Sequence, residues 1–255
     1  MKLEVIAVGN EVVFGHTINT NASLISKKMD ELGIEPCYHV AVRDRQKDIE
    51  QVLEIALNRA DIIIFCGGLG PTKDDLTKEA VCKFLNKPLI LNEEALKDLK
   101  AFFRIRNKNM TENNIKQAMF PSDCFILKNN FGTAPGCLFN LDNNKYIALL
   151  PGPPKEVEAM MEILIDDYFL KLKTYVYVTE EINVKGIGES LIEEQNSDLL
   201  GIFEDVECAT YIAQDYIVIR IKSRGFSKED AQEKLNYYKF NFSERLKEYI
   251  IGYNS

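Results

Sequence analysis

The stretch from Asp61 to Asp75 constrains the fold of this chain more than any other. It begins with an unbroken apolar run at 62–66, and three glycines follow it: Gly67, Gly68 and Gly70. A short run that is rich in β-branched residues and closed by glycine is typical of a strand buried on both faces. Glycine also lets the backbone turn sharply and approach a ligand closely. The stretch therefore predicts a strand, a glycine loop and a helix that starts near Asp74.

The same loop carries groups that suit a phosphorylated ligand. Backbone N–H groups at a helix N-terminus favour an anion, and Lys73 adds a positive charge. The adjacent carboxylates of Asp74 and Asp75 suit a hard divalent cation that keeps several waters and bridges to phosphate oxygens. The alternative is that both carboxylates only cap the helix and complement its dipole. The loop matches neither G-x-x-x-x-G-K-[ST] nor G-x-G-x-x-G, so the two commonest nucleotide fingerprints are absent.

Composition limits the class of protein and of partner. The net charge of −8 disfavours a nucleic-acid or anionic-membrane surface. No apolar run approaches the roughly 20 residues that span a bilayer, and the N-terminus lacks a signal-peptide pattern. The six cysteines have no zinc-site spacing, and two histidines are too few for a histidine-based metal centre, so a metal should be oxygen-ligated. We expect a cytoplasmic protein with reduced cysteines and with neither a membrane nor a nucleic-acid partner.

The first part of the chain has the pattern of a parallel α/β sheet. The alternating elements are strands at 3–8, 36–42 and 62–66 and helices at 22–32, 46–59 and 76–85. This order is typical of a parallel sheet covered by helices on both faces. The other predicted elements are a helix at 92–105, a short helix capped by Thr111, a strand at 125–127, a hairpin of 137–141 and 146–150, and a helix with Pro154 in its first turn that continues over 157–169.

Polar residues follow several of these elements. Glu11 comes just after the first strand, either as a site residue or as a solvent-facing loop glutamate. Asn19 or Asn21 can cap the next helix. The short helix after Thr111 carries four polar side chains, which form a solvated face or reach a ligand: Asn113, Asn114, Lys116 and Gln117.

Two later loops resemble the first in their small or rigid residues, at 131–136 and 151–156. The second of them lies between an apolar strand and a helix, as the 67–75 loop does. If both strands are central, the two loops meet over one crevice, because ligands bind beyond the carboxyl ends of parallel strands.

The pattern changes near residue 173, where we place a domain boundary between 1–172 and 173–255. The second unit is a small α+β pattern with strands at 175–184, 206–213 and 216–222 and helices at 189–200 and 227–249. About eighty residues are enough for a core of their own. The unit has more acidic than basic residues, so its own charge is negative.

Five separated motifs occur together in this order. They are A-V-G-N-E with N-T-N at 19–21, G-G-L-G-P-T-K-D-D-L-T at 67–77, M-T-E-N-N at 110–114 with K-Q-A at 116–118, G-T-A-P-G at 132–136, and L-P-G-P-P-K-E at 150–156. In this combination the chain resembles the competence/damage-inducible protein CinA family over nearly its whole length.

The resemblance implies a fold and an activity. It implies a three-layer α/β/α molybdopterin-binding-like domain with a mostly parallel sheet, similar to MoaB, MogA and MoeA, followed by a small α+β KH-like domain. It also implies a dimeric, metal-dependent pyrophosphatase that uses Mg²⁺ or Co²⁺ and splits ADP-ribose, or a related nucleotide, into AMP and ribose 5-phosphate. Full-length relatives continue into a deamidase domain marked by A-E-S-C-T-G-G. That stretch is absent here, so no nicotinamide-nucleotide deamidase activity is expected.

The site implied by this resemblance has a metal centre and a ligand pocket. Asp74, Asp75 and Glu11 would hold the metal, with Lys73 as a further catalytic residue. The implied ligand-binding residues are Asn10, Asn19, Asn21, Gly67, Gly68, Gly70, Pro71, Thr72, Asn113, Lys116, Gly132, Thr133, Pro135, Gly136, Pro151, Gly152, Pro153, Pro154 and Glu156. Asn10 and His16 depart from the family, which usually has threonine and glutamine there.

Two other functions use the same features. One is a protein that binds a phosphorylated pterin or a nucleotide without turnover, because the loops required are the same. The other is a regulatory protein that uses its second domain on RNA. A KH module clamps the nucleic-acid backbone with a G-x-x-G loop. Residues 175–255 contain no such loop, and their charge is negative, so RNA binding is disfavoured.

Overall fold

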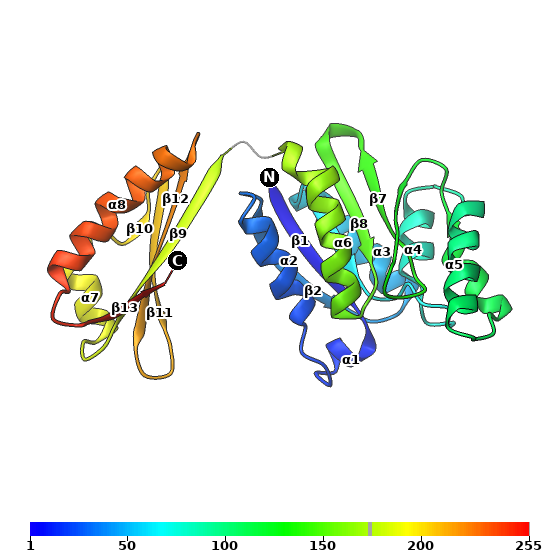
Figure 1. The fold of residues 1–255 in the computed structure, drawn as a ribbon, viewed down its shortest axis with the longest axis horizontal. Coiled ribbons are helices and arrows are strands. Elements are labelled where there is room, and N and C mark those ends of the chain that lie inside the picture. Colours follow the sequence, from blue (N-terminus) through cyan, green and yellow to red (C-terminus); the bar gives the residue numbers. More distant parts are fainter. Residues whose placement is uncertain (173–174, 255) are drawn as a thin grey trace. The chain divides into compact units, whose positions relative to one another are not determined.

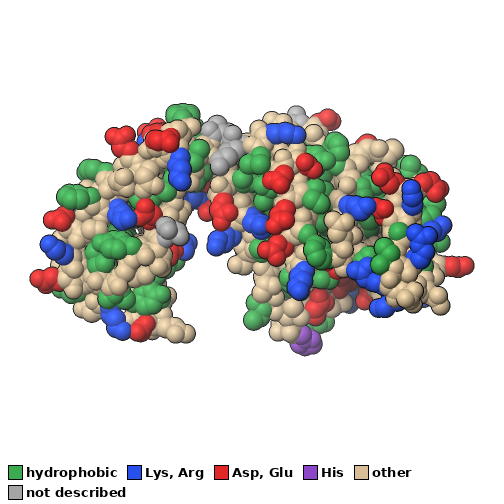
Figure 2. All heavy atoms as spheres, viewed as in Figure 1, with side chains coloured by type: hydrophobic (Ala, Val, Ile, Leu, Met, Phe, Trp, Pro, Cys, Tyr) green, Lys and Arg blue, Asp and Glu red, His purple; other side chains and the backbone are tan. Residues whose placement is uncertain are grey.

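The computed structural model describes residues 1–172 and 175–254, which belong to two compact units, Met1–Leu172 and Lys173–Ser255 (Figure 1). Each unit has a sheet and a hydrophobic core of its own. Lys/Arg and Asp/Glu side chains are interspersed over the surface in view in Figure 2. Within the described ranges, no helix combines the length and the apolar character needed to cross a membrane.

A six-stranded sheet forms the centre of the first unit, in the order β2-β1-β3-β8-β7-β6. Its strands are β1 (Lys2–Val8), β2 (Glu35–Val42), β3 (Ile62–Cys66), β6 (Phe125–Leu127), β7 (Gly136–Leu141) and β8 (Lys145–Leu150). β1 pairs in parallel with both β2 and β3, and β3 pairs in parallel with β8, which confirms the expected parallel arrangement. β7 is antiparallel to both of its neighbours, so β7 and β8 form the expected hairpin.

Helices cover both faces of this sheet (Figure 1). The helices of the unit are α1 (Asn10–Val13), α2 (Thr20–Asp30), α3 (Gln46–Arg59), α4 (Thr77–Phe84), α5 (Glu93–Ile105) and α6 (Pro154–Asp167), with the 3₁₀ segments η1 (Glu112–Ala118), η2 (Asp142–Asn144) and η3 (Phe169–Leu172). A two-stranded ribbon of β4 (Ile90–Leu91) and β5 (Met119–Phe120) supports α5 and η1.

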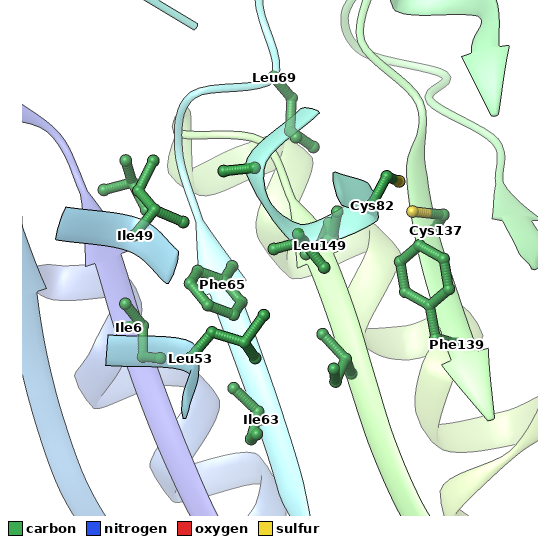
Figure 3. Packing of buried hydrophobic residues seen from close by; sticks show 14 of the residues in the cluster. Ile6, Ile49, Leu53, Ile63, Phe65, Leu69, Cys82, Cys137, Phe139 and Leu149 are labelled. Atoms are coloured by element: carbon green, nitrogen blue, oxygen red, sulfur yellow. The ribbon is translucent and has the colours of Figure 1, made fainter. Parts of the chain in front are cut away.

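Alternate strand residues divide the core into two layers, as the period of two in a strand requires. Ile6, Ile63 and Phe65 pack with α3 and α4 on one face, next to Ile49 and Leu53 (Figure 3). Neighbouring residues of the same strands face α2 and α6 on the other side. The strands of the centre are therefore apolar on both faces, as the run at 62–66 predicted.

The helix after the glycine loop starts later than expected. α4 begins at Thr77, and its N-cap residue, Leu76, makes no side-chain cap. The carboxylate of Asp75 instead accepts a hydrogen bond from the backbone N–H of Thr72, which precedes it in the chain, at 2.8 Å. The helix start near Asp74 was therefore placed too early, whereas the expected range 76–85 agrees with α4 to within one residue at each end. Neither Asp74 nor Asp75 caps the helix with its side chain.

The second unit has a five-stranded antiparallel sheet in the order β10-β11-β12-β9-β13. Its elements are β9 (Val176–Val184), α7 (Glu189–Gln195), β10 (Gly201–Ile202), β11 (Val206–Ile212), β12 (Ile217–Gly225), α8 (Lys228–Arg245) and β13 (Ile250–Asn254). The predicted helices at 189–200 and 227–249 are both too long. β13 was not predicted, because a five-residue edge strand contains too few residues to show a clear alternation.

An ion pair between a buried carboxylate and a half-buried guanidinium joins β1 to the end of α3. The side chain of Glu4 is fully buried, and both of its oxygens accept hydrogen bonds from the guanidinium of Arg59, at 2.7 and 2.8 Å. The same guanidinium lies 3.8 Å from the ring centroid of Tyr38. Such a pair is costly to break, because removal of one partner leaves an uncompensated buried charge.

We therefore predict that Arg59→Ala lowers the free energy of unfolding by about 3–5 kcal/mol. Urea unfolding of the variant measures this loss. The matched control is Arg104→Ala on the exposed side of α5, which should change stability by less than about 0.5 kcal/mol. A loss below about 1 kcal/mol in Arg59→Ala would show that the buried carboxylate does not depend on its partner.

Lys78 on α4 is a buried cation, and no carboxylate of the described residues forms an ion pair with it. Its ammonium donates to the carbonyl oxygens of Lys116 and Gln117, at 3.1 and 3.2 Å, and lies 3.9 Å from the ring centroid of Phe120. Burial lowers the pKa of Lys78 to about 8. Backbone carbonyls and an aromatic face therefore take the place of a counter-ion here.

The lowered pKa of Lys78 predicts how the stability of the protein depends on pH. The unfolded chain keeps the Lys78 proton up to about pH 10.5, whereas the folded state releases it near pH 8. Between these values the unfolded state binds more protons, so the contribution of Lys78 to stability increases with pH. We expect the stability of the unmutated protein relative to Lys78→Met to rise by roughly 2–3 kcal/mol between pH 7 and pH 10. A difference that stays constant in urea unfolding at both pH values would contradict this.

Candidate functional site

A cavity of about 430 Å³ lies beyond the carboxyl ends of β1, β3 and β8. The backbone N–H of Gly67, after β3, donates to the carbonyl oxygen of Leu150 at the end of β8, at 3.0 Å. The loops that follow these two strands both line the cavity, which confirms that they meet over one crevice. The chain leaves β1 on one side for β2 and returns on the other side as β3, so the cavity occupies the switch point of the sheet.

The glycine loop makes a sharp turn that only glycine fits. Gly67 and Gly68 have φ angles of +101° and +68°. A Cβ atom at Gly67 would lie 2.2 Å from the carbonyl oxygen of Val8, and one at Gly68 would lie 2.2 Å from the hydroxyl oxygen of Thr77. That hydroxyl donates to the Gly67 carbonyl at 2.8 Å. The turn is thus pressed against β1 and α4 and held there.

The turn leaves backbone donors next to the cavity. Gly68, Leu69 and Gly70 all line it. Among the contacts of the described residues, their three N–H groups donate no hydrogen bond. Consecutive free N–H groups in a turn make an anion-binding concavity. This part of the site therefore suits a phosphate oxygen.

The acidic segment after the turn is folded around Thr72. The hydroxyl of Thr72 lies 2.5 Å from a carboxylate oxygen of Asp74 and 2.5 Å from one of Asp75. Hydrogen bonding to Thr72 lowers the pKa of Asp74. Thr72 and Pro71 do not line the cavity, whereas Asp74 and Asp75 do. Thr72 thus orients the two carboxylates, although the sequence analysis expected it to contact the ligand.

Four carboxylates converge on this side of the cavity: Glu11, Asp44, Asp74 and Asp75. Burial raises the pKa of Asp44, and the negative charges of Glu11 and Asp74 raise it further. The backbone N–H of Asn10 opposes this rise by donating to Asp44 at 2.7 Å. Mutual repulsion of this kind marks a place where a cation or a proton is favoured.

The opposite wall carries amide and carboxylate groups. Asn21 donates to the carbonyl oxygen of Gly152 at 2.7 Å, which fixes the orientation of its amide. Its own carbonyl oxygen is buried and has no hydrogen-bond partner among the described residues. Such an atom calls for a ligand or a water donor. Glu156 also lines the cavity and accepts a hydrogen bond from Asn129 at 2.6 Å. Asn19 caps α2 by accepting from the N–H of Ala22 at 3.1 Å.

The structure brings most of the predicted site residues to this cavity. The lining includes Glu11, Asn19, Asn21, Gly67, Gly68, Gly70, Asp74, Asp75, Thr133, Pro151, Gly152, Pro153, Pro154 and Glu156. The other predicted residues do not line it: Asn10, Pro71, Thr72, Lys73, Asn113, Lys116, Gly132, Pro135 and Gly136.

The residues outside the cavity have other places in the fold. Lys73 and Asn113 are exposed. Gly132 and Pro135 line a second cavity, beside α5. Gly136 begins β7, where a Cβ atom would lie 2.6 Å from the carbonyl oxygen of Leu149. Glycine at this position therefore permits close strand packing.

The lining residues outside the predicted site include Asp44 and Gln117. Asp44 comes two residues after the end of β2. Like Glu11 after β1, it follows the carboxyl end of a parallel strand, where ligands bind. Gln117 is buried in η1 and donates to the hydroxyl of Thr133 at 3.0 Å. For Gln117, the sequence left open whether the polar face of this short helix is solvated or reaches a ligand.

The residues suit a divalent cation by type but do not form a closed cage. Within the described ranges, no group of three or more His, Cys, Asp or Glu side chains is arranged to hold a metal ion. Carboxylates from two loops nevertheless share one cavity with free backbone donors. This arrangement fits a cation that keeps several waters and takes its remaining ligands from a phosphorylated substrate.

Comparisons with known proteins agree with this architecture. Residues 4–171 match the family model of a probable molybdopterin binding domain, and residues 179–252 match that of the damage-inducible protein CinA KH domain. A putative competence-damage inducible protein of Acetivibrio thermocellus is 40% identical over 252 residues, and a CinA-like protein of Dictyoglomus thermophilum is 39% identical. Both alignments cover 99% of this chain and 61% of the relative.

A solved structure is also similar. The crystal structure of the protein CinA, of unknown function, from Thermoplasma acidophilum is 34% identical with a TM-score of 0.60, and the match covers 65% of this chain and 96% of that one. The predicted family and fold class are thereby confirmed. The chain belongs to the CinA family and combines a molybdopterin-binding-like α/β domain with a KH-like domain.

Proposed function

We propose that this protein is a metal-dependent nucleotide pyrophosphatase that hydrolyses ADP-ribose to AMP and ribose 5-phosphate. One observation carries the proposal. The carboxylates of Glu11, Asp74 and Asp75 share a cavity with Gly68, Leu69 and Gly70, whose N–H groups donate no hydrogen bond within the described part of the chain. A pyrophosphate needs both donors for its oxygens and acidic groups that hold a cation. The choice of ADP-ribose follows from the family resemblance.

The residues of the site would divide this task. The N–H groups of Gly68, Leu69 and Gly70 would bind a phosphoryl oxygen and offset its charge. Asp74, Asp75 and Glu11 would hold Mg²⁺ or Co²⁺, which when bound polarises phosphoryl oxygens and makes water a better nucleophile. Asp44, whose pKa is raised, is placed to accept a proton from an attacking water.

The opposite wall would bind the organic part of the ligand. The unpartnered carbonyl oxygen of Asn21 can accept a hydrogen bond from a ribose hydroxyl or a base amine. Gly152 and Pro153, beside it, offer little side-chain bulk and so leave room for a nucleoside. Lys73 is exposed and outside the lining, so any catalytic part for it requires a movement of its loop. A homodimer and a cytoplasmic location stay predictions from the resemblance and the composition.

The second candidate is a protein that binds a phosphorylated pterin without turnover. The observation that favours it is the match of residues 4–171 to the family model of a probable molybdopterin binding domain. The same free N–H groups and the same cavity would serve such a ligand. Thermal protection by a phosphorylated pterin, without any product from ADP-ribose, would favour this candidate over the first.

We predict that Asp75→Asn lowers metal-dependent formation of AMP from ADP-ribose by roughly 100-fold or more, because it removes a charge that holds the cation. The amide oxygen of the asparagine can still accept from Thr72, so the loop should keep its conformation. Chromatography of the nucleotide products measures the rate, with Mg²⁺ or Co²⁺ and with a chelator.

The control for this experiment is Asp142→Asn, in the exposed η2 turn between β7 and β8, which should keep full activity. Equal rates for Asp75→Asn and the unmutated protein would rule out the assigned part for Asp75. A metal-independent rate in the unmutated protein would rule out the cation.

A further inference from the structure

The polar segment η1 connects two walls of the cavity. The ammonium of Lys116 lies 3.0 Å from the carbonyl oxygen of Thr72 and 2.5 Å from that of Asp75. The next residue, Gln117, donates to the hydroxyl of Thr133 on another wall at 3.0 Å. One short segment therefore holds both the acidic loop and the 132–136 loop.

The contacts of Lys116 are directed at the backbone of the acidic loop. Two carbonyl oxygens and the carboxylate of Glu79, at 3.3 Å, surround its ammonium. Hydrogen bonds from a charged donor are about twice as strong as neutral ones. Since Lys116 does not line the cavity, these contacts replace the ligand contact that the sequence suggested.

The segment that carries Lys116 is itself held firmly. Thr111 and Asn114 form a capping box at its start. The amide of Asn114 also donates to the side-chain oxygen of Gln117 at 3.0 Å. The buried ammonium of Lys78, on α4, also donates to the carbonyl oxygens of residues 116 and 117. The backbone of Lys116 is therefore held in place by these hydrogen bonds.

The acidic loop, by contrast, depends on few contacts. The loop lies between β3, which ends at Cys66, and α4, which begins at Thr77. Inside the loop, Asp75 accepts from the N–H and the hydroxyl of Thr72. These bonds close the turn on itself, whereas those of Lys116 attach it to the rest of the domain. Loss of the attachment would let both carboxylates move relative to the glycine turn.

We infer that Lys116 is a positioning residue. It holds the 72–75 loop by its carbonyl oxygens and so presents the carboxylates of Asp74 and Asp75 to the cavity. The inference rests on the proposed function only for the statement that these carboxylates act in turnover. The placement of the loop is a separate property, which can be measured without substrate or metal.

The test is Lys116→Met, which keeps the length of the side chain but removes the charge. The first readout is amide hydrogen exchange of Thr72, followed by NMR in the absence of ligand, because this N–H is bonded only when the loop is closed on Asp75. We expect exchange to accelerate roughly tenfold or more at Thr72, with little change in β3. The matched control is Lys83→Met on α4, an exposed lysine paired with Glu50 at 3.5 Å, which should leave exchange at Thr72 unchanged.

The second readout is steady-state kinetics with ADP-ribose. We expect kcat of Lys116→Met to fall roughly 10- to 100-fold with a smaller change in KM, as for residues that orient metal-binding groups. Lys116→Arg should recover part of both readouts, because a guanidinium can also donate to two carbonyl oxygens.

The outcomes separate this inference from the proposed function. Faster exchange at Thr72 in Lys116→Met supports the inference even if the unmutated protein has no activity on ADP-ribose, and in that case the proposed function fails. Exchange at Thr72 equal to that of Lys83→Met overturns the inference. Equal acceleration at Thr72 and in β3, in both Lys116→Met and the milder Lys116→Gln, also overturns it, because the lysine would then serve global stability only.

Discussion

The close approach of the turn at Gly67 to the end of β1 is the constraint on which the cavity depends. β1 lies between β2 and β3, so the chain diverges on both sides of it and leaves a space beyond the strand ends. The turn can follow β3 directly into this space because Gly67 has no side chain. A Cβ atom at this position would clash with the carbonyl oxygen of Val8. The free N–H groups and the acidic loop are therefore placed by the strand order and not by their own sequence alone.

Electrostatics explains how an acidic site is held by a protein with a net charge of −8. Repulsion among Glu11, Asp44 and Asp74 would spread these carboxylates apart unless the backbone fixed them. Thr72 and Lys116 do so for the acidic loop, and the N–H of Asn10 does so for Asp44. Lys78 and Lys116 bind backbone carbonyl oxygens, and the carboxylate that Lys116 also contacts, Glu79, does not line the cavity. These lysines therefore fix the backbone and do not pair with the carboxylates of the cavity.

Much of the fold followed from periodicity. The bounds of α3 and β3 matched the expected ranges, since a clear apolar period of 3.6 residues and a fully buried run are the strongest local signals. Two features did not follow. β13 is a short edge strand whose partner, β9, lies far away in the chain. The carboxylate of Asp75 accepts a hydrogen bond from Thr72, which precedes it, and does not cap α4; a capping pattern read from the sequence does not reveal this.

The candidate site was predictable where residues follow strands, as for Glu11 and the glycine turn. The roles of single side chains were less so. Gly136 and Lys116 occur in motifs that suggest ligand contacts, yet one serves strand packing and the other binds backbone carbonyls. The role of Lys116 depends on tertiary contacts with a loop about forty positions earlier in the chain, and that of Gly136 on its contact with Leu149 in the neighbouring strand.

The central claim is that a pyrophosphate lies over the turn after β3, between this turn and the acidic side chains. The most direct measurement is a crystal structure of Asp75→Asn with ADP-ribose and Mg²⁺. The account predicts phosphoryl oxygens within hydrogen-bond distance of the N–H groups of residues 68–70, and the cation beside Asp74 and Glu11. A ligand bound in the cavity beside α5, or phosphates that do not contact the turn, would contradict it.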